Sequence, residues 1–168
     1  MSHAEASTIV FVEIPGGSRN KYELDHETGA IMLDRRLFTS MSYPADYGFV
    51  EGTLAEDGDQ LDALVLVAEP TFPGCRIRVR VVGVFHMTDE AGPDEKVICV
   101  PLRDPALARV HDVHDIAPEF RAEIEHFFQV YKDLEERKYT ETRGFGNRAE
   151  AEAIVAAARE RAASAPQA

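Results

Sequence analysis

The sequence contains no tryptophan, only two cysteines, and no apolar run that approaches the ~18 residues of a membrane span. Its first residues, MSHAEAST, have neither the basic start nor the apolar core of a secretory signal. Cys75 and Cys99 lie far apart, outside any metal-ligand spacing, in apolar strand-like segments, which is typical of reduced core cysteines. These absences argue against a disulfide-stapled scaffold and a membrane protein, and they predict a cytoplasmic location.

Basic residues are also scarce. The chain has 18 Lys and Arg against 30 Asp and Glu, a formal net charge of −12. Proteins that bind duplex nucleic acid usually have the opposite sign, gathered in a basic patch. We therefore expect no nucleic-acid partner, and we interpret most of the carboxylates as a solvated acidic surface.

The length of 168 residues suits one domain, so we expect a single domain over residues 1–168 with flexible ends at 1–7 and 164–168. The first two thirds have strand patterns, and alternation is clearest in residues 8–14, where Val10, Val12 and Ile14 share one face. The other expected strands are residues 21–25 and 30–35, joined by a Glu27-Thr28-Gly29 turn, and residues 61–68, 76–85 and 96–100.

Two helices are expected after the strands. Pro118 precedes an apolar stripe at helical spacing, formed by Phe120, Ile124, Phe127, Phe128, Tyr131 and Leu134. Asn147 and Glu150 resemble a capping box that opens a second helix through Ile154, Val155, Ala158 and Ala162. Strands followed by helices predict an α+β fold, a small barrel with helices packed against its side.

The segment from Asp57 to Asp62 carries three carboxylates at the mouth of an apolar strand. Gly58 permits a tight turn that aims Asp57 and Asp59 at one point, while Asp62 lies where a charge is costly unless it is paired or bound to metal. Oxygen-only ligands at short range suit a hard cation such as Mg²⁺. Taken alone, the motif also fits a polar hairpin loop. An EF-hand calcium loop is excluded, because its sixth position would be Asp62 instead of glycine and its twelfth Ala68 instead of glutamate.

Three further groups of residues carry charge or a hydroxyl. The loop from Asp89 to Lys96 joins two strands and, by itself, fits a solvated hairpin tip. A second group is spread over strands and consists of Glu13, Lys21, Glu23 and Arg35. In the first expected helix, Tyr131 belongs to the apolar stripe, yet its hydroxyl and the adjacent Lys132 ammonium are able to reach the helix edge.

These residues fall in segments that resemble the soluble, family I inorganic pyrophosphatases along nearly the whole chain. The segments are IVFVEIPGGSRNKYELD, LDRRLFTSMSYPADYGFVEGTL, EDGDQLDALVL, VGVFHMTDEAGPDEKVICVP and IEHFFQVYKDLE. The turn DHETG, which contains His26, resembles an actinobacterial subgroup of the bacterial type. The resemblance implies a magnesium-dependent enzyme that hydrolyses diphosphate to two orthophosphates. It also implies a five-stranded OB-like barrel with flanking helices, and a homohexamer.

The resemblance implies metal ligands at individual positions. Asp57, Asp62 and Asp94 match the ligands of the tightest Mg²⁺ site, and Asp62 is shared with a second ion. Asp89 and Asp94 match ligands of an ion that arrives with substrate, and two residues match positions near a further ion: Glu13 and Glu23. We expect roughly three to four Mg²⁺ per loaded site, Mn²⁺ or Zn²⁺ as substitutes, and inhibition by Ca²⁺, which is larger and activates water less.

The remaining positions match catalytic and phosphate-holding groups. Asp59 matches the general base for the attacking water. The positions that hold the phosphates are Lys21, Arg35, Tyr47, Tyr131 and Lys132, with Tyr43 and Lys96 in supporting positions. Gln60 departs from the family, which commonly has proline there, but it leaves the three carboxylates in register.

The chemistry of these positions agrees with the resemblance. The expected cavity holds seven carboxylates and four cationic side chains, so divalent cations are needed to reverse its field before an anionic diphosphate is attracted. An OB-type barrel that binds single-stranded nucleic acid would need a basic groove with stacking aromatics. A metal-buffering or interaction module would use the same carboxylates without turnover, but it leaves Lys21, Arg35 and Lys132 unexplained.

Overall fold

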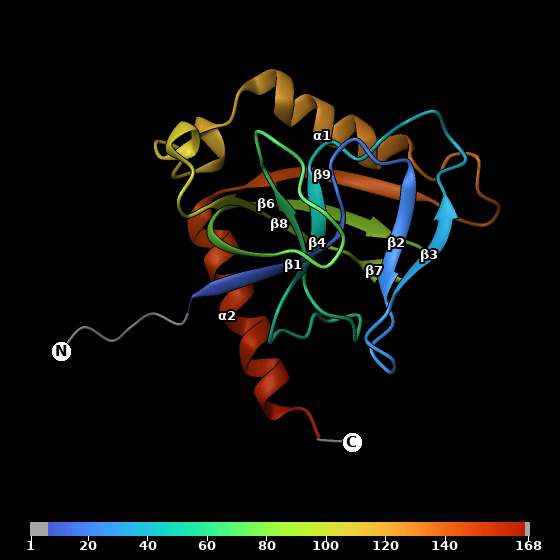
Figure 1. Ribbon diagram of the computed structural model, residues 1–168, viewed down its shortest axis with the longest axis horizontal. Coiled ribbons are helices and arrows are strands. Elements are labelled where there is room, and N and C mark those ends of the chain that lie inside the picture. The colour runs from blue at the N-terminus through green and yellow to red at the C-terminus, as the bar shows by residue number, and fades with distance from the viewer. Residues whose placement is uncertain (1–6, 167–168) are drawn as a thin grey trace.

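The computed structural model describes residues 7–166; residues 1–6 and 167–168, which form most of the expected flexible ends, lie outside the described residues. Strands dominate the first two thirds of the chain, and both α-helices lie in the last third (Figure 1). The elements are β1 (Thr8–Ile14), β2 (Asn20–Leu24), β3 (Ile31–Arg36), β4 (Asp46–Val50), β5 (Asp62–Val65), β6 (Arg76–Asp89), β7 (Gly92–Pro93), β8 (Lys96–Pro101), α1 (Pro118–Val130), β9 (Thr140–Gly146) and α2 (Arg148–Ser164), with 3₁₀ turns at Pro105–Leu107 and Val113–Asp115.

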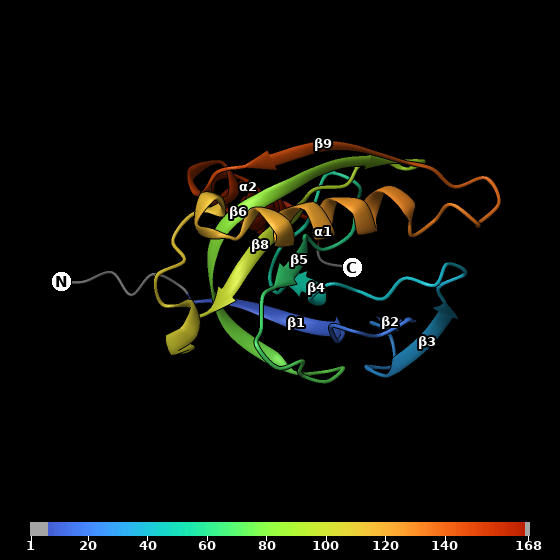
Figure 2. The ribbon, with the colours of Figure 1, turned by 90° about the horizontal axis from the view of Figure 1, so that it is seen from above.

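Five strands close into a ring. The hydrogen-bonded order is β1-β4-β5-β8-β6, and β6 returns to β1. Only the β5–β8 pairing in this ring is parallel. Strand β6 is 14 residues long and curves around the barrel, with a register shift between Val81 and Gly83 (Figure 2). The predicted α+β fold with a five-stranded barrel and two C-terminal helices is therefore confirmed.

The core consists of two apolar clusters, and each helix packs its buried side chains into one of them. Helix α1 contributes Ile124, Phe127 and Phe128 to the first cluster, and α2 contributes Ala151, Val155 and Ala158 to the second. Cys99 is fully buried and Cys75 is half-buried, both as free thiols. No helix in residues 7–166 is long and apolar enough to cross a membrane.

Three strands were not expected from the sequence: β4, β9 and the two-residue β7, which lies in the expected loop from Asp89 to Lys96 and pairs with the end of β6. Strand β4 contains Gly48, a weak strand former, but a Cβ there would lie only 1.8 Å from the Phe11 carbonyl oxygen. The close approach of β1 therefore requires glycine at this position. Strand β9 begins with the polar residues Thr, Glu, Thr and Arg, which lack the apolar alternation of a typical strand. Its antiparallel pairing with β6 stabilises it instead.

The helix boundaries also differ in part from the predictions. Helix α1 ends at Val130, and Leu134 lies beyond it with 67% of its surface exposed, so its assignment to the apolar stripe was wrong. The Asn147 side chain accepts a hydrogen bond from the Glu150 backbone N–H at 2.9 Å, as expected for a helix cap. The Glu150 carboxylate, however, lies 2.8 Å from His86 Nε2, so the return half of the capping box is replaced by a tertiary contact.

Asp46, at the start of β4, is a fully buried carboxylate that ties two loops to the barrel. It accepts hydrogen bonds from the Gly16 backbone N–H and from both the backbone N–H and the hydroxyl of Thr71.

We expect Asp46→Ala to lower the free energy of unfolding by about 2 kcal/mol, because the buried donors lose their acceptor. Urea unfolding with exposed Glu69→Ala as the control measures this; equal losses in both variants would contradict it.

Candidate active site

A cavity of about 400 Å³ opens between the β2–β3 hairpin, the mouth of the barrel and the end of α1. Of the side chains selected from the sequence, all but Tyr43 line it; they are Glu13, Lys21, Glu23, Arg35, Tyr47, Asp57, Asp59, Asp62, Asp89, Asp94, Lys96, Tyr131 and Lys132. Tyr43 lies behind this wall, with its ring centroid 5.4 Å from that of Tyr47 and 4.7 Å from that of Phe127. The sequence positions are thus gathered at one place.

Lys96 lies at the floor of the cavity and is 1% exposed. Its ammonium donates to the Tyr47 hydroxyl at 2.8 Å, to Asp62 Oδ2 at 3.0 Å and to Asp94 Oδ2 at 3.1 Å. The parallel pairing of β5 and β8 sets Asp62 and Lys96 opposite each other. Burial by itself lowers the pKa of Lys96, but the neighbouring carboxylates raise it well above its ordinary value, so Lys96 stays charged. Burial and the charge of Asp62 raise the pKa of Asp94.

The turn at Gly58 presents two carboxylates to the cavity. Gly58 has φ +92°, a left-handed conformation that favours glycine, and the Asp59 backbone N–H donates to Asp57 Oδ1 at 3.0 Å. Both Asp57 and Asp59 are exposed to solvent. The turn is therefore closed by hydrogen bonds within itself, from the backbone and from Asp57 Oδ1, and both carboxylates remain exposed to a ligand.

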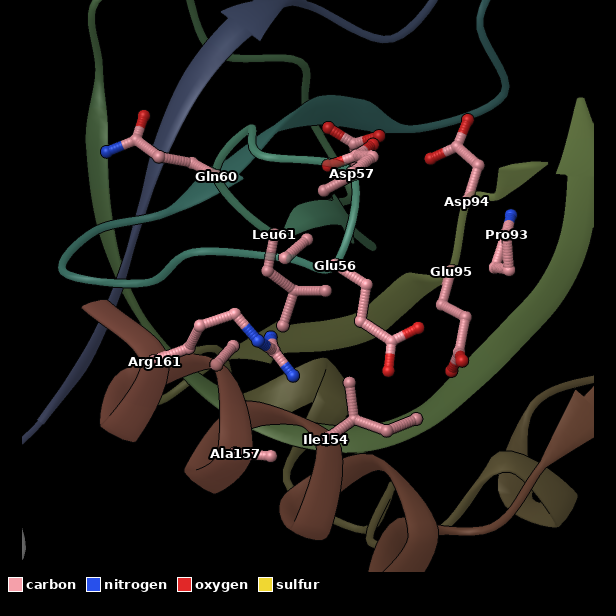
Figure 3. A pocket seen from close by; sticks show the side chains of 13 residues that line it. Glu56, Asp57, Gln60, Leu61, Pro93, Asp94, Glu95, Ile154, Ala157 and Arg161 are labelled. Carbon is pink, nitrogen blue, oxygen red and sulfur yellow. The ribbon is translucent and has the colours of Figure 1, made fainter. Parts of the chain in front are cut away.

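Helix α2 supports this loop from behind. A second cavity of about 100 Å³ lies between the loop and α2, with Leu61, Ile154 and Ala157 on its apolar side (Figure 3). Arg161 extends from α2 toward the loop, and its Nη1 donates to the Leu54 carbonyl at 2.7 Å. Three carboxylates line both cavities and form the wall between them: Asp57, Asp62 and Asp94.

The β2–β3 hairpin supplies two cations from adjacent strands. Lys21 and Arg35 are paired in register, next to a β-bulge, and Asp34 contacts both side chains. Lys21 Nζ also lies 2.6 Å from Glu23 Oε1, and Arg35 Nε lies 2.6 Å from Glu135 Oε1. Two like charges directly opposite each other on paired strands repel. The carboxylates of Glu23, Asp34 and Glu135 offset this repulsion between Lys21 and Arg35.

The end of α1 supplies the remaining pair. Tyr131 and Lys132 are 6% and 9% exposed, and the Lys132 ammonium lies 3.3 Å from Asp89 and 3.5 Å from Glu90. Burial raises the pKa of Tyr131. The Tyr131 ring belongs to the apolar cluster of α1, as expected, with its centroid 5.1 Å from that of Phe127, and both Tyr131 and Lys132 also line the cavity.

Sequence reasoning missed several lining residues. Lys138 adds a fifth cation, in a turn where Arg137 has φ +61°. His26, from the turn between β2 and β3, also lines the cavity; it is exposed and has its ring centroid 5.7 Å from that of Phe49. The spacing of Lys138 from Lys132 gives no periodic signal, because an irregular turn joins them.

The carboxylates of the cavity suit a divalent cation by charge and donor type. Within residues 7–166, no three Asp, Glu, His or Cys side chains already converge closely enough to form a metal cluster. Asp62 and Asp94 each approach one common cation, Lys96, and the Asp57 and Asp59 carboxylates face solvent beside them. Hard, oxygen-only donors with excess negative charge fit Mg²⁺.

Glu13 has the clearest titration signature of the cavity. Burial, together with the charges of Asp62 and Glu23, raises its pKa from 4.5 to about 7, although the Leu24 backbone N–H donates to its carboxylate at 2.8 Å. The folded state therefore binds a proton that the unfolded state has released, so stability falls as pH rises from about 4.5 to about 7.

In the metal-free protein we expect Glu13→Gln to raise the free energy of unfolding at pH 8.5 by about 1–2 kcal/mol, because the buried charge is removed. At pH 4.5 the difference should disappear. Urea unfolding in EDTA at both pH values measures it, with exposed Glu123→Gln on α1 as the control. A gain that is the same at both pH values would rule out titration of Glu13 as its cause.

Comparison with known proteins agrees with this geometry. Residues 10–163 match the Pyrophosphatase family, described as inorganic pyrophosphatase. The inorganic pyrophosphatase of Streptomyces coelicolor is 62% identical over 146 residues, which are 87% of this chain and 90% of that protein. That of Corynebacterium efficiens is 55% identical over 155 residues, 92% of this chain and 98% of that protein. Both relatives agree with the actinobacterial resemblance.

Solved structures show the same fold. The crystal structure of inorganic pyrophosphatase from Thermus thermophilus superimposes with a TM-score of 0.93 at 43% identity, covering 98% of this chain and 95% of that one. The enzyme from Helicobacter pylori gives a TM-score of 0.92 at 42% identity, covering 95% and 96%. The match of sequence and fold over nearly the whole length establishes that this chain belongs to the inorganic pyrophosphatase family.

Proposed function

We propose that this protein hydrolyses inorganic pyrophosphate to two orthophosphates in a Mg²⁺-dependent reaction. The observation that carries the proposal is the 400 Å³ cavity, in which seven carboxylates face five cationic side chains in a chain of this family. Carboxylates in excess suit divalent cations, and the fixed cations suit phosphate oxygens. Hydrolysis needs both ligand types at one place.

Asp57, Asp62 and Asp94 would hold the tightest ion, Asp62 would be shared with a second one, and Asp89 would join Asp94 around an ion that accompanies substrate. Glu13 and Glu23 extend the donor set toward the hairpin. Bound Mg²⁺ supplies positive charge to the phosphates and lowers the pKa of water toward ~7. Roughly three to four ions would bring the loaded cavity near neutrality.

The cationic and phenolic side chains would hold the phosphates. They are Lys21, Arg35, Tyr47, Tyr131 and Lys132, with Lys96 and Tyr43 in support. Arg35 Nη2 is buried and donates no hydrogen bond within residues 7–166, so it is available to an anionic ligand. Phosphoryl transfer depends mainly on positioning and charge neutralisation, which such fixed donors supply.

Asp59 is the proposed general base. It lies on an exposed turn, outside the Lys96 network, and it lines the main cavity without lining the cavity behind it. A carboxylate in that position is free to accept a proton from a water that attacks phosphorus.

We also propose a cytoplasmic homohexamer. Several large apolar side chains are more than half exposed in the single chain, including Met32, Leu33, Phe38 and Phe72. Exposed apolar groups of this size are common where subunits meet. Light scattering on the purified protein tests the assembly, and a monomeric mass at micromolar concentration would contradict it.

The test of the proposed function is phosphate release from pyrophosphate. We expect full dependence on added Mg²⁺, no turnover in EDTA, and inhibition when Ca²⁺ is added, because calcium tolerates irregular coordination and activates water less. A metal-buffering protein would bind Mg²⁺ and release no phosphate. Full activity in EDTA, or equal rates with Ca²⁺ and Mg²⁺, would contradict the proposal.

A further inference from the structure

Glu135 is a buried carboxylate that the proposed chemistry does not use. Its side chain is only 5% exposed, and it lies in the turn after α1, where its backbone N–H donates to the Lys132 carbonyl at 2.9 Å. A buried charge is costly unless it is paired. Within residues 7–166, the one cation that forms an ion pair with Glu135 is Arg35, with Nε 2.6 Å from Oε1.

Two carboxylates hold the Arg35 guanidinium from different sides. Glu135 contacts Nε, and Asp34 contacts Nη1. Asp34 is one third exposed and is shared with Lys21, whereas Glu135 is buried and pairs with Arg35 alone among the described residues. The planar guanidinium is therefore oriented mainly by Glu135. Nε and Nη2 are both buried without a hydrogen bond among the described residues; Nε has the Glu135 carboxylate as its ion-pair partner, whereas Nη2 has no carboxylate partner in residues 7–166.

The same turn places two functional groups at once. Lys132 and Glu135 are joined by the backbone hydrogen bond of one turn, so the chain that brings Lys132 to the cavity also brings Glu135 to the back of Arg35. Arg35 comes from β3, in the separate two-stranded sheet. The ion pair is thus a tie between the hairpin and the end of α1, across the cavity.

We propose that Glu135 is a positioning residue that holds the Arg35 guanidinium with Nη2 directed at a substrate phosphate. It touches neither substrate nor metal and acts through Arg35. The inference rests on the proposed function, in which Arg35 holds a phosphate. Small displacements of a substrate-holding group are costly, since a shift of about 1 Å is able to reduce turnover about 10²-fold.

The first experiment compares Glu135→Gln with Glu136→Gln, its exposed neighbour in sequence. Glutamine keeps the shape of Glu135 but removes its charge, so the guanidinium loses its fixed orientation. We expect kcat/KM for magnesium pyrophosphate to fall about 10–10²-fold, mostly through a higher KM, with no change in Glu136→Gln. Glu135→Asp, which keeps the charge but withdraws it by one methylene, should lose less activity than Glu135→Gln while folding normally. Unchanged kinetics in both Glu135 variants would overturn the proposal.

The second experiment is a double-mutant cycle in kcat/KM with Arg35→Ala. If Glu135 acts through Arg35, the double variant Arg35→Ala/Glu135→Gln should be no slower than Arg35→Ala alone. If the fold-losses in kcat/KM of the two single variants instead multiply in the double variant, Glu135 acts independently of Arg35. That result would overturn the inference and leave the proposed function intact. Full activity in Arg35→Ala would overturn both the inference and the proposed role of Arg35. If Glu135→Gln does not fold, the cycle run with Glu135→Asp decides between the same outcomes.

Discussion

Asp59→Asn should lower kcat by about 10²–10⁴-fold, the usual loss when a general base is removed. Asparagine keeps the turn, because the hydrogen bond that closes it runs from the Asp59 backbone N–H to Asp57. The side chain then retains its shape but no longer accepts a proton. Mg²⁺ binding to the free enzyme should stay close to that of the unmodified protein, and the acid limb of the pH–rate profile should shift or vanish.

Asp62→Asn is the matched comparison and should fail differently. Asp62 lies beside Lys96 and Asp94 at the start of β5, so removal of its charge weakens the proposed ion sites directly. We expect the Mg²⁺ concentration for half-maximal rate to rise. Calorimetric Mg²⁺ titration and pH–rate curves on both variants separate the two roles. If Asp59→Asn instead loses Mg²⁺ binding and recovers its rate at high Mg²⁺, Asp59 is a ligand and not the base.

Lys96→Met should destabilise the metal-free protein by about 3 kcal/mol. Methionine fills similar space, but it leaves Asp62 and Asp94 without the ammonium that lies 3.0 and 3.1 Å from them. Removal of one partner from a buried ion network exposes the cost of the charges that remain. Because a divalent cation would replace the lost charge, added Mg²⁺ should raise the melting temperature of Lys96→Met by more than that of the unmodified protein.

The control for this prediction is Lys138→Met. Lys138 also lines the cavity, but it is exposed and forms no ion pair within the described residues. Its replacement should change stability by less than about 0.5 kcal/mol. Equal stability of Lys96→Met and the unmodified protein in EDTA would mean that Asp62 and Asp94 need no counter-charge, and it would weaken their assignment to cation sites.

Local patterns predicted much of this fold correctly. The alternation in residues 8–14 predicted β1 and its buried face, and the spacing of apolar residues after Pro118 predicted α1. Strand β4 was not predicted because it contains Gly48, which has a low strand propensity. Glycine is required there by the close contact with β1, and a sequence pattern does not show that contact. Leu134 was misassigned because a periodic pattern does not show where a helix ends, and here the chain turns at Tyr131.

The sequence by itself determined the fold class, the chemistry of the candidate residues and, through long matching segments, the family. The tertiary structure decided which groups meet. Lys96 lies between Asp62 and Asp94 because β5 and β8 pair in parallel, and Arg35 meets Glu135 because the hairpin folds against the end of α1. Short-range patterns encode helices, strands and turns, because these depend on neighbours along the chain. Register between distant strands and the pairing of buried charges depend on the packing of the whole barrel, and no local pattern carries that information.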